Sequence, residues 1–172
     1  MELTKARKIS VVGNSGAGKS TLSERLGNRL DIDVLSIDKI YWLTKWQLRD
    51  HESFRSIHDK WLEADSWIIE GVGYWNELEQ RISESDIVIF VDVPIDICKA
   101  QADKRIKEER MFRNPYITEG CEYADMKERQ MEVIEYFHNN LRPKLISLFS
   151  ELNHEKVIIA GGYSGLNVGN KT

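Results

Sequence analysis

Short runs of apolar, mostly β-branched residues recur along the chain and alternate with segments of helical periodicity. Each run is continuous rather than alternating, as expected of a parallel strand that is covered on both faces. Such runs lie at residues 9–12, 34–37, 67–69, 87–91 and 157–160. Because strands alternate with helices, the pattern predicts an α/β fold: a doubly wound parallel sheet with helices on both faces.

The segments between these runs carry apolar residues every three or four positions, as on the buried face of a helix. These patterns lie at 22–30, 54–62, 78–82, 97–100, 126–141 and 145–152. Pro94 directly follows the fourth run and suits the first turn of a helix. Pro143 is expected to kink or restart the last long helix, because proline has no N–H to donate.

The most specific motif lies between the first strand and the first helix. Residues 13–20 read Gly-Asn-Ser-Gly-Ala-Gly-Lys-Ser, which matches the phosphate-binding loop G-x-x-x-x-G-K-[ST]. This arrangement aims backbone N–H groups and the positive end of a helix dipole at a polyphosphate. An ordinary glycine-rich turn would leave the flanking strand and helix unexplained. We therefore expect ATP to bind at Gly13, Asn14, Ser15, Gly16, Ala17, Gly18, Lys19, Ser20 and Thr21.

Three side chains indicate how this site would handle phosphate and metal. Lys19 supplies positive charge for the β- and γ-phosphates, and the Ser20 hydroxyl is the expected Mg²⁺ ligand. Asp92 follows the fourth apolar run, as an acidic residue does in the second motif of phosphate-loop proteins. Its carboxylate is expected to hold Mg²⁺ directly or through water.

Polar residues also follow the second and third strands, where ligands of parallel sheets bind. Asp38 is expected to accept a proton from a substrate hydroxyl or to help hold the metal; the alternative is a helix or turn cap. Glu70 and Gly71 either bind the acceptor or form a structural turn. Trp42 lies in the same region, as do Trp46 and Trp75. These rings either stack on an acceptor or pack in the core.

The segment 104–113 is rich in arginine and lysine. Arg105, Arg110 and Arg113 are candidates to close over the transferring phosphoryl group, as donors in a lid over residues 104–125. The following stretch, 114–121, lacks a core pattern, as a mobile cover would. The alternative is a solvated helix face balanced by neighbouring glutamates.

Length and composition limit the remaining possibilities. The 172 residues suffice for one domain, which we expect to span 1–172. A net charge of −4 does not favour nucleic-acid binding, and two cysteines do not indicate a disulfide framework or a zinc site. Neither a signal peptide nor a membrane-spanning run is evident, so we expect a reduced, cytoplasmic setting. The sequence does not indicate an oligomeric state.

Together with the phosphate loop, four short segments carry a family resemblance over nearly the whole chain. They are Ile-Asp-Lys-Ile-Tyr-Trp at 37–42, Trp-Ile-Ile-Glu-Gly at 67–71, Glu-Gly-Cys at 119–121 and Arg-Pro-Lys at 142–144. The chain thus resembles the adenylate-kinase-like P-loop proteins of the FlaR-type "DNA topology modulation" family. Members usually have Asp-Gly-Asn-Tyr where this chain has Glu-Gly-Val-Gly-Tyr at 70–74. That departure leaves the acceptor open.

The resemblance implies the nucleoside- and nucleotide-kinase branch of P-loop folds. It implies a three-layer sandwich with a five-stranded sheet in the order 2-3-1-4-5, an acceptor-binding region at about 38–75 and a small lid. Arg105 and Arg110 match lid arginines better than Arg113 does.

Two classes of function fit these features. The first is a small-molecule kinase that transfers the γ-phosphoryl group of Mg-ATP to a nucleoside, nucleotide or similar acceptor. The second is a regulatory ATP-binding or ATPase module that switches a protein partner. A GTPase would need an Asn-Lys-x-Asp motif, which the sequence lacks. The strand-end carboxylates and the arginine segment favour the kinase.

Overall fold

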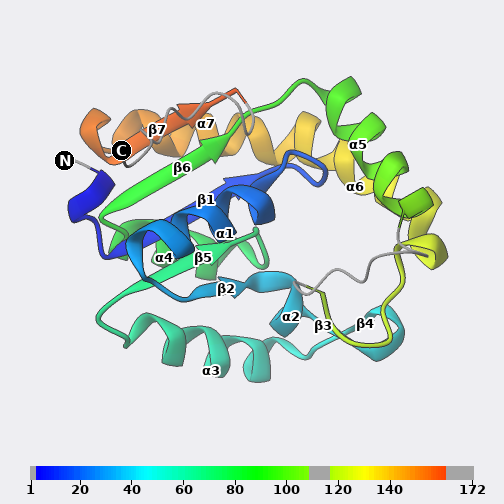
Figure 1. Cartoon of the computed structure of the whole chain (residues 1–172), viewed down its shortest axis with the longest axis horizontal. Helices are drawn as coiled ribbons and strands as arrows, with labels where there is room; N and C mark the ends of the chain where they lie inside the picture. Colours follow the sequence, from blue (N-terminus) through cyan, green and yellow to red (C-terminus); the bar gives the residue numbers. More distant parts are fainter. Residues whose placement is uncertain (1–2, 109–116, 162–172) are drawn as a thin grey trace.

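A five-stranded parallel sheet with helices on both faces forms the centre of the molecule (Figure 1). The computed structural model describes residues 3–108 and 117–161. The strands are β1 Lys8–Gly13, β2 Val34–Ser36, β3 Trp42–Leu43, β4 Gln47–Leu48, β5 Trp67–Glu70, β6 Ile87–Val91 and β7 Val157–Ala160. The α-helices are α1 Lys19–Leu30, α2 Ile37–Tyr41, α3 His51–Leu62, α4 Trp75–Glu84, α5 Ile95–Glu108, α6 Lys127–Tyr136 and α7 Arg142–Glu151. Shorter helical turns are η1 Leu3–Lys5, η2 Thr44–Trp46, η3 Tyr123–Met126, η4 Phe137–Leu141 and η5 His154–Lys156.

The main sheet has the strand order β2-β5-β1-β6-β7. Counted along the chain within this sheet, that is the expected order 2-3-1-4-5, and all five predicted strands are confirmed. Val11 pairs with Glu70 and Gly13 with Val91 in neighbouring strands. Since the strands are parallel, their carboxyl ends lie at one edge, where the phosphate loop leaves β1.

Both faces of the sheet are buried, which explains the continuous apolar runs. On one face, Ile9 and Val11 of β1 pack in a cluster that contains Leu22 of α1 and Ala102 of α5. On the other face, Val12 packs in a cluster formed with α4, η4 and α7. Consecutive residues of a strand point to opposite faces, so one run of apolar residues serves two helical layers.

The long C-terminal helix is interrupted where proline predicts it. The segment Phe137–Leu141 is a π-helical turn between α6 and α7, and Pro143 lies in the first turn of α7. The missing N–H of proline is tolerated there because the first N–H groups of a helix have no partner within that helix. Pro94 likewise directly precedes α5, as expected.

A short antiparallel pair, β3–β4, was not predicted. Trp42 pairs with Leu48 and Leu43 with Gln47. We call residues 42–48 the hairpin. A second unpredicted feature joins it: Ile117, Cys121 and Tyr123 form a buried cluster with which Trp42, Trp46 and Ile106 pack. The segment 114–121 was expected to lack a core pattern. Its described part, 117–121, is instead packed in a small core with residues that are distant in sequence.

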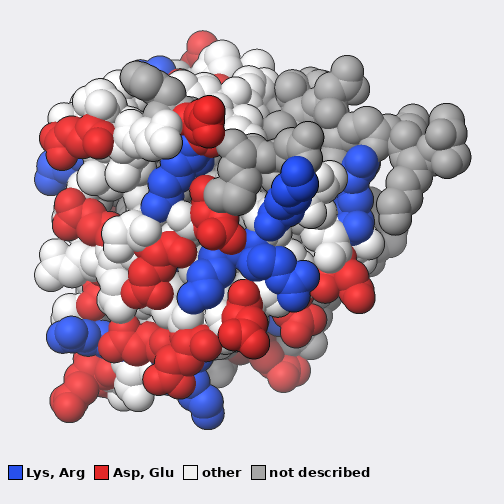
Figure 2. Space-filling view, turned by 90° about the vertical axis from the view of Figure 1, so that its left-hand side faces the viewer, with Lys and Arg blue, Asp and Glu red and all other residues white. Residues whose placement is uncertain are grey.

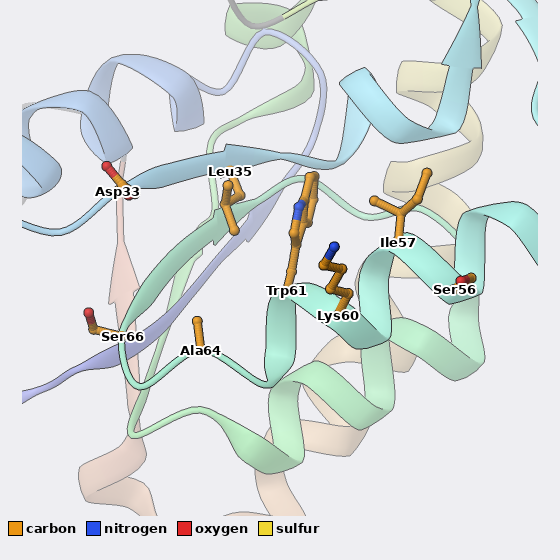
Figure 3. A pocket seen from close by; sticks show the side chains of 8 residues that line it. All are labelled: Asp33, Leu35, Ser56, Ile57, Lys60, Trp61, Ala64 and Ser66. Atoms are coloured by element: carbon orange, nitrogen blue, oxygen red, sulfur yellow. The ribbon is translucent and has the colours of Figure 1, made fainter.

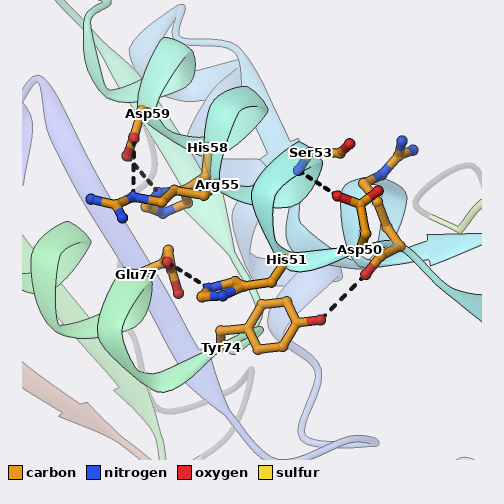
Figure 4. Close-up of polar contacts among 9 residues, drawn as sticks. Asp50, His51, Ser53, Arg55, His58, Asp59, Tyr74 and Glu77 are labelled. Atoms are coloured by element: carbon orange, nitrogen blue, oxygen red, sulfur yellow. Dashed lines mark hydrogen bonds and ion pairs between the residues drawn. The ribbon is translucent and has the colours of Figure 1, made fainter.

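A group of polar side chains lies between α3 and α4 (Figure 4). Asp50 caps α3 by accepting a 2.9 Å hydrogen bond from the Ser53 amide, and His51 pairs with Glu77 at 2.8 Å. His58, about two turns after His51 in α3, is fully buried. Burial and the nearby Arg81 charge lower the pKa of His58 from 6.5 to about 4, against smaller opposing effects of Asp59 and Glu77.

His58 predicts an acid-sensitive contribution to stability. Because its pKa is lower in the folded than in the unfolded chain, its contribution is complete above pH 6.5 and is lost as the pH falls toward 4. We expect the free energy of unfolding, measured with urea, to be about 2 kcal/mol lower at pH 5 than at pH 7 because of this residue alone. His58→Leu should remove that part of the pH dependence. An unchanged difference between the two pH values in His58→Leu would contradict the assignment.

Candidate active site

The phosphate loop follows β1 in the conformation that its glycines require. Gly16 has φ +77°, and a Cβ there would lie 2.3 Å from the carbonyl oxygen of Cys98 in α5. Gly18 adopts a left-handed conformation at the N-cap of α1. Only glycine fits such close backbone approach and positive φ without strain. The loop therefore leads directly into the N-terminus of a twelve-residue helix, which favours an anion.

Two loop side chains make contacts that the motif did not predict. The Asn14 side chain is buried; its amide donates to the carbonyl of Ile134 in α6 at 2.9 Å, and its Oδ1 accepts from the Ser15 amide at 2.8 Å. Lys19 Nζ donates to the Asn14 carbonyl at 2.9 Å. The Asn14 side chain thus anchors the loop to α6, while its backbone remains part of the expected ATP site.

Asp38 lies in the first turn of α2, directly after β2. It is open to solvent, yet protein surrounds it closely enough that desolvation, and then the charge of Glu70, raise its pKa to about 6. Lys19 and Arg105 act in the opposite direction. The N-cap position of α2 belongs to Ser36, so Asp38 does not serve as that cap. A carboxylate with a pKa near 6 is well suited to accept a proton at neutral pH.

Glu70 at the end of β5 is almost completely buried, and its Oε1 accepts a 2.6 Å hydrogen bond from the Ser36 hydroxyl. The next residue, Gly71, has φ +110°, and its carbonyl accepts a 2.6 Å bond from Nη2 of the buried Arg81. Burial lowers the pKa of Arg81 to about 9, and the charge of Glu70 opposes that change. Strand β5 thus ends in the carboxylate of Glu70, which is held in place near Asp38.

Asp92 follows β6 on the other side of β1. Both of its carboxylate oxygens accept hydrogen bonds from Arg142 at the start of α7, at 2.8 and 2.7 Å. This paired geometry orients the carboxylate firmly. A direct bond from Asp92 to a metal would have to replace one of these hydrogen bonds. A contact through water would not, so the water-mediated role is the part of this prediction that we retain as a proposal.

Arg105 of α5 reaches the phosphate loop. Its Nη2 donates to Ser15 Oγ at 3.3 Å, its Nη1 donates to the hydroxyl of Tyr123 at 3.1 Å, and its guanidinium carbon lies 4.2 Å from the centre of the Tyr123 ring. This places one of the expected lid arginines beside the expected phosphates. Arg110 and Arg113 lie outside the described residues.

The candidate aromatic residues separate into two places. Trp42 and Trp46 contact each other edge to face at 5.6 Å, within the hairpin that follows Asp38. Trp75 instead packs against the cluster under α4 and α7, with Lys144 Nζ 5.7 Å from the centre of its ring. Only Trp42 and Trp46, of these three residues, therefore lie together on the segment that follows β2 and α2.

Two other surfaces differ from this site in character. A hollow of about 670 Å³ lies between α3 and the edge strand β2 (Figure 3), and none of its lining residues belongs to the phosphate loop. They are Asp33, Leu35, Ser56, Ile57, Lys60, Trp61, Ala64 and Ser66. On the face shown in Figure 2, acidic and basic side chains of the described residues are interspersed, unlike the single-sign basic surface of many nucleic-acid-binding proteins.

Within residues 3–108 and 117–161, no three histidine, cysteine or acidic side chains are grouped as a protein-only metal site would need. None of the helices described there combines the length and apolar character needed to cross a bilayer.

Comparisons with known proteins place the chain among relatives. It is 31% identical over 125 residues to the uncharacterized protein YqaC of Bacillus subtilis (strain 168), an alignment that covers 70% of this chain and 67% of YqaC. The chain belongs to the same family as YqaC. A shikimate kinase of Pseudoalteromonas translucida (strain TAC 125) is 25% identical over 122 residues, covering 60% of this chain and 69% of that enzyme. No protein-family model matches the chain.

Comparison with solved structures establishes the fold of the chain. A shikimate kinase from Bacteroides thetaiotaomicron superposes with a TM-score of 0.54 at 15% identity, covering 91% of this chain and 87% of that one. A shikimate kinase from Acinetobacter baumannii in complex with shikimate gives a TM-score of 0.56 at 15% identity, covering 95% and 88%. The chain therefore has the same α/β fold as these two shikimate kinases.

Proposed function

We propose that the protein is a P-loop kinase that transfers the γ-phosphoryl group of ATP to a small-molecule acceptor, a nucleoside, a nucleotide or a similar compound. One observation carries this proposal. Asp38, with its pKa raised to about 6, lies in the electrostatic reach of both Lys19 and Arg105 at the mouth of the phosphate loop. A proton acceptor next to phosphate-binding cations is the arrangement that phosphoryl transfer needs.

The loop fits a nucleotide triphosphate with Mg²⁺. Its glycines allow the loop to pass close to the backbone of β6 and α5 and to enter the N-terminus of α1, where phosphate oxygens would bind. Ser20 is the loop hydroxyl that would hold the metal. Bound Mg²⁺ would neutralise charge on the phosphate oxygens. Asp92, oriented by Arg142, would contact the metal through water.

The remaining residues act on the two reactants. Lys19 would bind the β- and γ-phosphates, and Arg105 would stabilise charge on the transferring group. Asp38 would orient the acceptor hydroxyl and take its proton as the new O–P bond forms. Glu70, Gly71 and Trp42 border the same region and would contact the acceptor. The FlaR-type resemblance remains a proposal about the branch of the fold, and a cytoplasmic location remains an expectation.

Phosphoryl transfer from labelled ATP tests this function. A panel of nucleosides, nucleotides and small alcohols would serve as acceptors, and shikimate belongs in it because one structural neighbour binds that compound. We expect labelled product with one chemical class of acceptor and none with Lys19→Ala. ATP binding without transfer to any member would instead support a regulatory ATP-binding module, which the kinase neighbours do not favour.

Arg105 carries a separate prediction. Arg105→Ala should lower kcat by about tenfold or more and change the KM for ATP less, because the guanidinium acts most strongly on charge that develops in the transition state. Lys104→Ala is the matched control, since Lys104 on the same helix is exposed and pairs only loosely with Glu108 at 3.7 Å. If kcat is the same in Arg105→Ala and the parent, Arg105 takes no part in transfer despite its contact with Ser15.

A further inference from the structure

The guanidinium of Arg105 lies over the ring of Tyr123 and contacts the phosphate loop. Tyr123 is 6% exposed, lies 4.2 Å below the guanidinium carbon and accepts a 3.1 Å hydrogen bond at its hydroxyl. The contact with the ring and the hydrogen bond to its hydroxyl together restrain the guanidinium. The remaining Nη2 then points to Ser15 in the loop.

Tyr123 is in turn held by the hairpin. Its ring lies 5.5 Å from that of Trp46, and Trp46 Nε1 donates to the carbonyl of Glu122 at 2.9 Å. The Trp46 amide donates to Sγ of Cys121 at 3.3 Å. These contacts fix the backbone on the N-terminal side of Tyr123 as well as its ring.

Three further hydrogen bonds join the segment 118–121 to residues 42–45. Thr118 Oγ1 donates to the Trp42 carbonyl at 2.8 Å, Cys121 Sγ donates to the Leu43 carbonyl at 3.2 Å, and the Lys45 amide donates to the Gly120 carbonyl at 3.1 Å. The hairpin and Tyr123 therefore form one packed unit. The hairpin begins directly after α2, the helix that carries Asp38.

We propose that Tyr123 is a positioning residue for Arg105, and that Trp46 makes the placement of Arg105 depend on the hairpin that borders the acceptor region. The placement itself needs no kinase activity. Its consequence for turnover rests on the proposed function. Under that function, an acceptor that contacts the hairpin would also change the position of Arg105 beside the phosphates.

A spectroscopic measurement tests the placement without any turnover. The Arg105 Nε–Hε resonance, assigned from its loss in Arg105→Lys, should carry a ring-current shift from Tyr123. We expect Tyr123→Leu to abolish this shift and Trp46→Leu to reduce it, while Tyr136→Leu, at an exposed tyrosine of α6, leaves it unchanged. An Arg105 resonance that is the same in the parent and in Tyr123→Leu would overturn the proposal.

A double-mutant cycle tests the consequence for transfer. Tyr123→Leu should lower kcat about tenfold with the KM for ATP within about threefold, and Tyr123→Phe, which keeps the ring, should recover part of the loss. In an Arg105→Ala background, Tyr123→Leu should change kcat less than about twofold, because both act through one group. Full additivity would contradict positioning through Arg105. If no acceptor is phosphorylated by the parent, the kinase proposal fails while the resonance shift still decides the placement.

Discussion

Lys19→Ala is expected to lower phosphoryl transfer by about three orders of magnitude or more while the protein stays folded. Lys19 carries the only charged side chain of the loop 13–21, and its charge would act on the phosphates where negative charge develops. Lys19 Nζ donates to the Asn14 carbonyl within the same loop, a contact whose loss removes little from the fold. The measurement is transfer from labelled ATP, with thermal unfolding as the check on folding.

Lys107→Ala is a suitable control for this experiment. Lys107 is 73% exposed on α5 and pairs at 2.7 Å with Asp103, a surface contact that contributes little to stability. Transfer by Lys107→Ala should match that of the parent. Near-normal transfer by a folded Lys19→Ala protein would rule out the phosphate-loop assignment.

Asp38→Asn is expected to lower transfer about a hundredfold or more and to leave ATP affinity within a few-fold. The amide keeps the shape of the side chain but cannot take the proton of the acceptor. The parent should also lose activity as the pH falls through about 6, because Asp38 becomes protonated there. Asp38→Asn should lack this decline.

Two measurements on the same preparation decide the role of Asp38. ATP titration reports donor binding, and a transfer assay between pH 5 and pH 8 reports the reaction and its pH profile. Asp33→Asn serves as control, since Asp33 lies before β2, at the opposite end of the strand. If Asp38→Asn transfers at the parent rate, Asp38 has a structural role and the acceptor-binding carboxylate is Glu70.

The sheet was predictable because its signals are local. A run such as Ile87–Val91 is apolar at every position, as a strand buried on both faces requires. The phosphate loop was predictable for the same reason, since backbone conformation there depends on the glycines themselves. The order of strands came from family resemblance, because nothing within single strands specifies their neighbours.

The features that were missed depend on contacts between distant segments. Trp46 packs on Tyr123, and Asp92 pairs with Arg142 across 50 residues. Neither pairing leaves a periodic signal. The hairpin is also too short for alternation to appear, with two residues in each strand. Sequence indicated which residues carry charge at the strand ends, but not which partner fixes each of them.

The bond from Asn14 to the Ile134 carbonyl spans 120 residues and has a consequence for assembly of the site. The motif is continuous in sequence, but its loop is held in place by a helix from the last third of the chain. ATP binding should therefore report completed folding rather than formation of the first strand–loop–helix unit. In refolding experiments, we expect ATP affinity to recover only after α6 has docked, and therefore later than the circular-dichroism signal of the helices. A bound nucleotide would then stabilise only the fully folded domain.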